Sequence, residues 1–470
     1  MKLAVLLLLA LGAYASTSNG SAAAQAGARP HEPQAGAAGV GDPYYPELGN
    51  GGYDVSHYDL DLEVDMASGW LTGEATLQAV ALQDLSSFNL DLYGLDVDSI
   101  DVDGTEVDFD HDVHEVTVDL EDHLHSGAPF QVVVRYEGVP ELVPEPAMSV
   151  LPGVGWIHAQ SGVYVLSECS GAASWFPCND HPRDKATFSF TVKVKKPFVV
   201  ASNGLPVGET DHGDSRTFRF EASDPMATYL ATVNIAEFKT TELDGPAGIA
   251  MTLYHPTDAT PQELKAFERQ GEMIEYFSML FGPYPFEACG GVISYENLPG
   301  ALETQTLPVY GRGMPEVVVA HEVAHQWFGN CVSPGRWQDM WLNEGFASYA
   351  EWLWLEKNSG ALALDNRARR TYAGLRRRRV GSTAEPGLGA LFGANVYERG
   401  AYVLHLLRDE VGDEKFFELL TRWVETFHDA TATTEDFLAL SDKVCGEGTS
   451  EFLTPLLYDD ILPVVPDYEG

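Results

Sequence analysis

Two histidines four residues apart constrain this chain more than any other feature of its sequence. They are His321 and His325 in the segment HEVAH, with Glu322 beside the first. In an α-helix, residues four apart lie on the same face, so both imidazoles can reach one metal ion. The run VVVA just upstream is apolar nearly all round, which predicts a buried helix whose polar side chains require partners. The pattern therefore indicates a metal centre inside a helical core.

A third metal ligand is predicted at Glu344, with eighteen residues between it and the second histidine. The first helix is expected over 314–328, and the second from Asn343, a favourable N-cap that places Glu344 in the first turn. Two His and one carboxylate are typical of a catalytic zinc site, which keeps a fourth position for water. Glu322 can then take a proton from that water as it attacks a carbonyl. The alternative is a surface helix that carries two histidines and no metal.

Further motifs follow one another along the chain. They are WFPCNDHP at 175–182 followed by Lys185 and Ala186, GALET at 300–304, HEVAHQWFGN at 321–330, WLNEGFASYAEW at 341–352 and VYERGA at 396–401. Together they resemble the gluzincin aminopeptidases, the aminopeptidase-N-like family, whose motifs read FPCxDEPxxKA, GxMEN and YEKGA. His181 stands in place of Glu, Leu302 in place of Met and Thr304 in place of Asn. The resemblance covers about residues 45–460.

The resemblance implies one Zn²⁺ per chain, bound by the two histidines and Glu344. It also implies that Tyr397 is catalytic and donates a hydrogen bond to the oxyanion of the tetrahedral intermediate. The alternative for Tyr397 is a core aromatic residue on an amphipathic helix. Asp339 is a further candidate, as a residue that orients a metal ligand.

A peptidase that removes N-terminal residues must hold a free ammonium group near the metal, and carboxylates do this best. The resemblance assigns this role to Glu303 and Glu168, although Leu166 stands where the family commonly has Gln. Gly300 would let the loop that begins with Gly300 and Ala301 approach the peptide substrate as an edge strand. These residues predict peptide substrates with a free N-terminus.

The expected fold class is α+β with more than one domain. Short alternating segments separated by Gly-containing turns predict an all-β domain over 45–240. Helical periodicity dominates afterwards and predicts helices at 261–281, 314–328, 343–357, 396–410, 413–427 and 434–444. The resemblance implies a saddle-like β domain followed by a thermolysin-like, mainly helical catalytic domain at 241–470. It also implies a short form of the family, without the C-terminal helical domain and with a more open cleft.

The N-terminus predicts export. Residues 1–26 read as a signal peptide, with a basic end, an apolar run over 3–15 and possible cleavage after Ala15 or Ala26. An uncleaved membrane anchor is the alternative, but the run is too short to span a bilayer. Residues 27–44, rich in Ala, Gly and Pro, are expected to form a disordered leader. We therefore expect a secreted, extracellular protein with no stable membrane insertion.

The net charge of −42 is extreme, and no Lys or Arg occurs between Arg29 and Arg135. Because phosphate contacts require Lys and Arg, a nucleic-acid partner is excluded. Such self-repulsion is tolerable where salt screens it, which indicates a saline environment or an acidic surface that maintains solubility. The basic segment 367–379 is expected to be a helix paired with acidic residues, the alternative being a clamp for substrate carboxylates.

The five cysteines show no CxxC pair and are not predicted metal ligands, whereas a bridge between Cys169 and Cys178 is conceivable in an exported protein.

Taken together, these features predict a secreted zinc aminopeptidase. One alternative is a thermolysin-like endopeptidase, which would not need Glu303 and Glu168 near an ammonium group. Another is a non-catalytic relative that serves as a binding scaffold, against which the intact metal and catalytic residues count. Nothing in the sequence predicts an oligomeric state.

Overall fold

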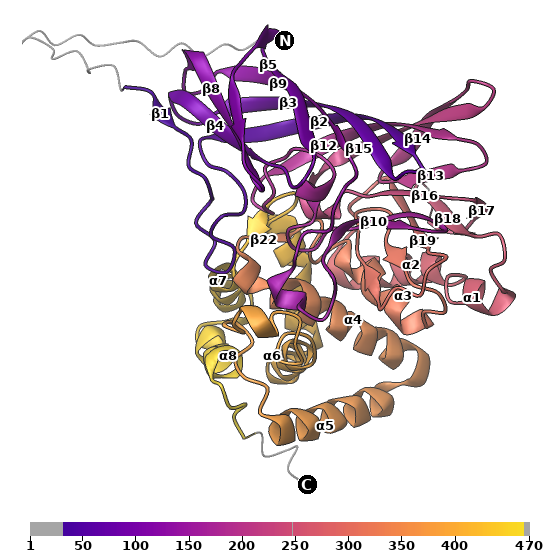
Figure 1. The fold of residues 1–470 in the computed structure, drawn as a ribbon. Helices are drawn as coiled ribbons and strands as arrows, with labels where there is room; N and C mark the ends of the chain where they lie inside the picture. Colours follow the sequence, from indigo (N-terminus) through magenta and orange to yellow (C-terminus); the bar gives the residue numbers. More distant parts are fainter. Residues whose placement is uncertain (1–31, 247, 465–470) are drawn as a thin grey trace, which may run out of the picture. The chain divides into compact units, whose positions relative to one another are not determined.

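An eight-stranded sheet is built from the alternating segments of the N-terminal half. The structure is a computed structural model that describes residues 32–246 and 248–464 (Figure 1). Across the sheet the strands are β14 (Leu205–Asp211), β15 (Ser215–Ala227), β12 (Lys185–Lys195), β2 (Tyr53–Asp65), β3 (Trp70–Ala81), β9 (Pro129–Gly138), β5 (Asp96–Val102) and β6 (Thr105–Glu106). Buried and solvent-facing residues alternate along β2, so one face of the sheet packs on the core.

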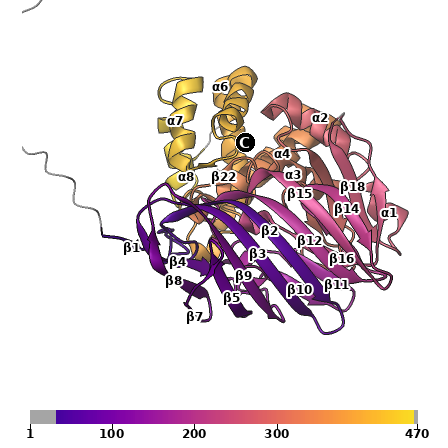
Figure 2. The same cartoon turned by 90° about the horizontal axis from the view of Figure 1, so that it is seen from above.

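Two four-stranded sheets complete the β-rich part. One contains β1 (Gln34–Ala35), β4 (Leu85–Asp91), β8 (Glu115–Leu124) and β7 (Phe109–His111). The other contains β10 (Gly155–Ala159), β11 (Gly162–Leu166), β16 (Val233–Ala236) and β13 (Val199–Ser202). Seen from above, the long strands lie side by side with the helices along one flank (Figure 2). The predicted all-β N-terminal domain is confirmed.

A five-stranded sheet begins the second part of the fold. Its order is β17 (Phe238–Glu242), β18 (Ala250–Pro256), β19 (Ala288–Ile293), β21 (Val309–Tyr310) and β20 (Ala301–Leu302). Strands β18, β19 and β21 are parallel, and β20 pairs antiparallel with β21 at the edge. Because β17 already belongs to this sheet, the chain changes sheets at Phe238, slightly before the predicted boundary at 240.

Helices make up most of the remaining chain, as predicted. They are α1 (Pro261–Lys265), α2 (Gln270–Phe281), α3 (Glu316–His325), α4 (Trp341–Ser359), α5 (Ala361–Arg378), α6 (Tyr397–Thr426), α7 (Thr434–Cys445) and α8 (Thr449–Tyr458). Gly412, at φ 79° and ψ 161°, divides α6 into two segments that correspond to the helices predicted at 396–410 and 413–427. The helix predicted at 261–281 is interrupted between α1 and α2, and α8 was not predicted.

The predicted start of the second ligand-bearing helix is wrong. Asn343 lies inside α4 and is buried, whereas the helix begins at Trp341. A short 3₁₀ turn, Trp337–Asp339, leads into the helix through Met340, which is itself in a helical conformation. Glu344 nevertheless lies in the first turn of α4, as predicted.

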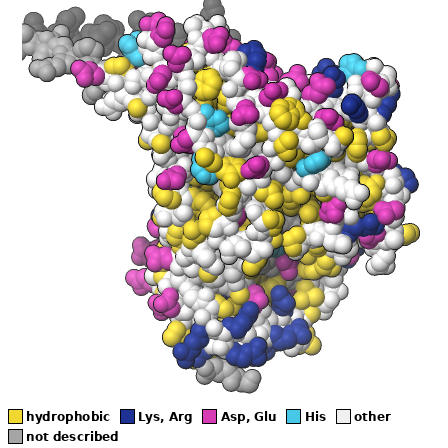
Figure 3. Space-filling model, viewed as in Figure 1, with side chains coloured by type: hydrophobic (Ala, Val, Ile, Leu, Met, Phe, Trp, Pro, Cys, Tyr) yellow, Lys and Arg dark blue, Asp and Glu magenta, His cyan; other side chains and the backbone are white. Residues whose placement is uncertain are grey.

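Arginines of the basic segment lie on α5 and form the expected ion pairs. Arg369 pairs with Asp365, and Arg378 pairs with Glu398. Figure 3 shows Lys and Arg gathered at the lower end of this face, over α5, while Asp and Glu are spread over the rest.

Cys169 and Cys178 are both buried and unpaired, so the conceivable bridge between them is absent. Among the described helices, none has the length and apolar character needed to cross a membrane.

The prediction of a disordered leader over 27–44 is wrong for residues 33–44. β1 pairs with β4, and the Asp42 side chain is fully buried. This carboxylate accepts hydrogen bonds from the backbone N–H groups of Tyr44, Tyr45 and Trp337. It also lies 3.2 Å from His181 Nε2, so the histidine that replaces the family's Glu has a buried partner. Residues 27–31 and the predicted signal peptide at 1–26 lie outside the described residues.

We expect Asp42→Ala to lower the free energy of unfolding by about 3–5 kcal/mol, because it breaks a buried pair and leaves backbone donors without an acceptor. Although burial acts to raise the pKa of Asp42, its hydrogen bonds with His181 and with the backbone hold that pKa below the ordinary value. The lost carboxylate is therefore an ionised one. Urea unfolding of the variant measures the change, and Asp98→Ala at an exposed position is the control, expected within about 0.5 kcal/mol of wild type. Equal stability of the two variants would contradict this role of Asp42.

Candidate active site

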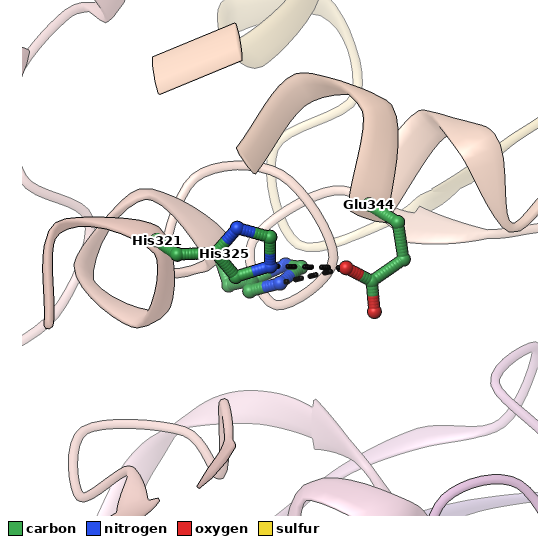
Figure 4. A group of neighbouring side chains, drawn as sticks. All are labelled: His321, His325 and Glu344. Carbon is green, nitrogen blue, oxygen red and sulfur yellow. Dashed lines mark hydrogen bonds and ion pairs between the residues drawn. The ribbon is translucent and has the colours of Figure 1, made fainter. Parts of the chain in front are cut away.

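The three predicted metal ligands converge. His321 and His325 project from α3, and Glu344 projects from α4 (Figure 4). The Glu344 Oε2 atom lies 3.0 Å from His321 Nε2 and 3.5 Å from His325 Nε2. All three residues are buried, and their ligand atoms lie within 4.8 Å of one another. Two imidazole nitrogens and a carboxylate oxygen around one point are the donor set that suits Zn²⁺.

Each histidine is oriented by a partner on its other ring nitrogen. His321 Nδ1 lies 2.8 Å from Glu351 Oε1, and His325 Nδ1 lies 3.0 Å from the Phe328 carbonyl oxygen. Such partners hold the ring in place and leave Nε2 free to bind a metal. Glu351 was not predicted, yet it lies seven residues after Glu344 on α4, on the same helical face.

Asp339 does not orient a metal ligand, so that prediction is wrong. Its carboxylate pairs with Arg336 and accepts hydrogen bonds from the backbone and the hydroxyl of Thr434. Thr434 is the first residue of α7, so Asp339 secures the start of that helix.

A close contact between two glycines brings α4 and α6 together. A Cβ on Gly345 would lie 3.0 Å from the Gly400 Cα, and a Cβ on Gly400 would lie 2.8 Å from the Gly345 Cα. Glu344 precedes Gly345, and Tyr397 lies one turn before Gly400, so the contact places both side chains at the same centre. The Tyr397 ring is parallel to that of His321, at an interplanar angle of 9° and a centroid distance of 6.1 Å.

A second set of carboxylates adjoins the metal ligands. Glu168 follows β11 and Glu303 follows β20, and both are almost completely buried, at 5% and 2% exposure. Carboxylate oxygens of these two residues and of Glu344 lie within 4.8 Å of one another. Glu168 Oε1 is buried and has no hydrogen-bond partner among the described residues. An unpartnered buried oxygen of this kind fits a ligand that carries donors only, such as an ammonium group.

Glu322 lies in the same centre. One of its carboxylate oxygens is within 4.8 Å of ligand atoms of Glu303 and His325. Burial raises the pKa of Glu322 to about 7, and burial together with the charge of Glu303 raises the pKa of Glu168 well above its ordinary value. Several buried carboxylates with so few cations nearby are stabilised by the binding of positive charge. The site is therefore complementary to a divalent metal and to a second cation beside it.

The backbone around Glu303 is fixed by α3 and the loop that follows it. The Glu303 carbonyl accepts hydrogen bonds from Asn330 Nδ2 at 2.7 Å and from Gln326 Nε2 at 3.3 Å. Gly300 directly precedes β20, the edge strand of the five-stranded sheet, and Ala301 is the first residue of that strand. Apart from Gly300 and its two chain neighbours, no heavy atom of the described residues lies within 4 Å of the position that a Cβ on Gly300 would occupy. The arrangement is open to an extended peptide on this side, as the predicted substrate role requires.

Tyr229 is a site residue that the sequence did not reveal. Its hydroxyl lies 3.5 Å from Glu303 Oε1 and 3.3 Å from Asn343 Nδ2. Burial, together with Glu303 and Glu168, raises the pKa of Tyr229 well above its ordinary value, so the phenol stays protonated. It comes from a 3₁₀ turn of the β-rich part, Thr228–Leu230, far in sequence from the metal ligands. No local pattern connects it with them.

The fold and this centre define a metal-dependent hydrolase site of the HExxH-plus-Glu type. The family described as "Peptidase M1 N-terminal domain" matches residues 55–230, and the "Peptidase family M1 domain" matches residues 266–455. The crystal structure of an M1 zinc metallopeptidase from Deinococcus radiodurans has a TM-score of 0.85 and 32% sequence identity, covering 91% of this chain and 99% of that one. The chain belongs to peptidase family M1.

Curated relatives are longer. Aminopeptidase M1-B of Oryza sativa subsp. japonica is 29% identical over 330 residues, which cover 63% of this chain and 37% of that protein. Aminopeptidase N of Canis lupus familiaris is 28% identical over 355 residues, which cover 67% of this chain and 36% of that protein. The chain thus spans just over a third of the length of these curated relatives.

Proposed function

We propose that this protein is a zinc-dependent aminopeptidase that removes the N-terminal residue of peptides. The observation that carries the proposal is the buried pair Glu168 and Glu303 directly beside Glu344, with Glu168 Oε1 unpartnered. An ammonium group held by these two carboxylates would lie next to the metal ligands. Only the first peptide bond of the substrate can then reach the metal, which distinguishes an aminopeptidase from a thermolysin-like endopeptidase.

The chain's own residues divide the chemistry between them. His321, His325 and Glu344 would hold Zn²⁺, which would supply Lewis acidity and lower the pKa of a water molecule at the site. The Glu322 carboxylate accepts the proton of the attacking water and delivers it to the leaving amine nitrogen. The Tyr397 hydroxyl donates a hydrogen bond to the oxyanion that develops on the scissile carbonyl oxygen.

The comparisons support this reading. The rice and dog relatives are named aminopeptidases, and a mutant of the Deinococcus radiodurans enzyme was solved with a Tyr-Ser-Ala substrate. A two-domain M1 zinc metallopeptidase mutant was also solved with L-tryptophan and with L-arginine. These ligands are free amino acids and a short peptide, the products and substrates expected of an aminopeptidase. The binding-scaffold alternative is disfavoured because the metal ligands, Glu322 and Tyr397 are all present at one centre.

Product analysis tests the proposal. A pentapeptide with five different residues is incubated with the protein, and the products are followed by mass spectrometry over time. We expect loss of one residue at a time from the N-terminus, and no cleavage after metal removal by a chelator. Early appearance of internal fragments would show an endopeptidase and overturn the proposal.

The proposal includes export, for which the predicted signal peptide at 1–26 is the support. Expression of the full sequence in a secreting host, followed by N-terminal sequencing of the protein in the medium, tests it. We expect a mature N-terminus that begins after Ala15 or Ala26. A protein that stays inside the cells with Met1 intact would overturn this part.

Tyr397→Phe is expected to lower kcat by about 10²–10³ with little change in KM, because the lost hydrogen bond forms mainly in the transition state. The ring and its packing against His321 are kept, so the metal content should not change. Steady-state kinetics with one aminoacyl substrate, together with metal analysis, gives both quantities. A raised KM with an unchanged kcat would make Tyr397 a binding or packing residue instead.

A further inference from the structure

Three side chains with metal-binding atoms meet at a second place in the fold. The loop after α3 carries Cys331, and the loop after α6 carries His428 and Asp429. The two loops are joined by the parallel pair β22 (Ser333–Pro334) and β23 (Thr431–Ala432). The ligand atoms of the three side chains lie within 4.8 Å of one another. Within residues 32–246 and 248–464, this is the one such group that contains no catalytic residue.

A buried thiol and a carboxylate oxygen with open hydrogen-bonding capacity distinguish this group from an ordinary surface cluster. The Cys331 side chain is fully buried, and Asp429 Oδ1 is a buried oxygen without a hydrogen-bond partner among the described residues. His428 Nδ1 lies 3.0 Å from Asp429 Oδ2, and the His428 side chain is 47% exposed. The group therefore offers three converging donors and one side open to solvent.

The backbone holds these donors in place. The partly buried Lys185 side chain donates hydrogen bonds from its ammonium group to the carbonyl oxygens of Asn330 and Cys331, at 2.8 and 2.9 Å. Asp429 has a positive φ of 56°, a conformation that Asp tolerates better than most residues and that turns the chain beside Cys331. The thiol position and the carboxylate position are thus both set by the fold.

The charges nearby favour an added cation. Burial and a hydrogen bond with the neighbouring Glu287 raise the pKa of Asp224 to about 7, and Asp429 adds to this effect. Lys185 is the opposing positive charge, and its hydrogen bonds are directed to the backbone carbonyl oxygens of Asn330 and Cys331. The carboxylates outnumber the amine, so a divalent ion would relieve their repulsion.

We propose that Cys331, His428 and Asp429 bind a second Zn²⁺, with water on the exposed side as the fourth ligand. A thiolate, an imidazole and a carboxylate suit Zn²⁺, whereas Ca²⁺ and Mg²⁺ take oxygen ligands. The Cys331 thiol loses its proton to solvent when the metal binds, so binding weakens as the pH falls. The metal would tie the loop after the catalytic helix, whose Asn330 holds the Glu303 carbonyl, to the end of α6.

Cobalt substitution tests the proposal independently of catalysis. The full chain is stripped of metal and titrated with Co²⁺, and bound Co²⁺ and near-ultraviolet absorption are measured. A thiolate ligand gives an intense sulfur-to-cobalt charge-transfer band, which the His321, His325 and Glu344 site cannot produce because it contains no sulfur. Wild type is expected to bind two Co²⁺ per chain and to show the band.

Variants assign the two equivalents. Cys331→Ser is expected to lose the charge-transfer band and to bind one Co²⁺ fewer per chain. His321→Ala is expected to keep the band and to lose the Co²⁺ of the His321, His325 and Glu344 site. Cys445→Ser, which changes a half-buried thiol elsewhere, should leave both equivalents and the band. His428→Gln changes a half-exposed position that the core does not depend on. It should lower the affinity for the Co²⁺ that gives the charge-transfer band at least about tenfold. Wild type that binds one Co²⁺ without the band, or a band that survives in folded Cys331→Ser, would overturn the proposal.

Discussion

Glu322→Gln is expected to retain its metal and to lose about 10²–10⁴-fold in kcat. The amide has nearly the shape of the carboxylate but cannot accept a proton from water, so the contribution of a general base is lost. Burial raises the pKa of Glu322 above its ordinary value, so this carboxylate is a stronger base than a solvent-exposed glutamate. The metal ligands are untouched, so metal analysis should give the same content as wild type.

The matched control for this prediction is His325→Ala. It removes a metal ligand from the same helix, so it should lose both metal and activity. Steady-state kinetics and metal analysis on the two variants separate the roles. A Glu322→Gln protein with near-normal kcat would contradict the general-base assignment, and one that has lost its metal would place Glu322 among the ligands.

Glu303→Ala is expected to lower kcat/KM on free peptides by about 10²–10⁴-fold. The ammonium group of the substrate would lose one of its two buried carboxylate partners, and breaking such a buried pair costs about 3–5 kcal/mol. Glu303→Gln keeps the size of the side chain and removes only its charge, so a large loss in that variant assigns the effect to the charge. Glu275→Ala, at an exposed position on α2, is the control and should leave kcat/KM unchanged. A loss of less than about threefold in both Glu303 variants would contradict an ammonium-binding role.

Without the family resemblance, the residues that could be predicted are those whose relation is local in the sequence. His321 and His325 lie one helical turn apart, so helical periodicity alone placed them on one face. Glu351 could have been found in the same way, because it lies two turns after Glu344 on the same helix. Tyr229 could not, because its place beside Glu303 depends on the packing of a β-rich segment against the helices.

Two of the errors have the same physical origin. The composition of residues 33–44 is typical of disorder. The Asp42 carboxylate nevertheless forms hydrogen bonds with His181 and with the backbone N–H of Trp337, far along the chain, and these contacts order the segment. Asn343 has the preference of an N-cap, but a preceding 3₁₀ turn starts α4 earlier, and the buried Asn343 amide contacts Tyr229 instead. In both cases long-range contacts override a local preference.

The central claim, that a buried carboxylate pair selects a free N-terminus, is tested most directly by one comparison. The measurement is kcat/KM of the wild-type protein for a peptide and for the same peptide with an acetylated N-terminus. Acetylation removes the ammonium charge and leaves Glu168 and Glu303 without their cation, so a loss of about 10²–10⁴-fold is expected. Equal cleavage of the two peptides, at the first or at internal bonds, would contradict the account.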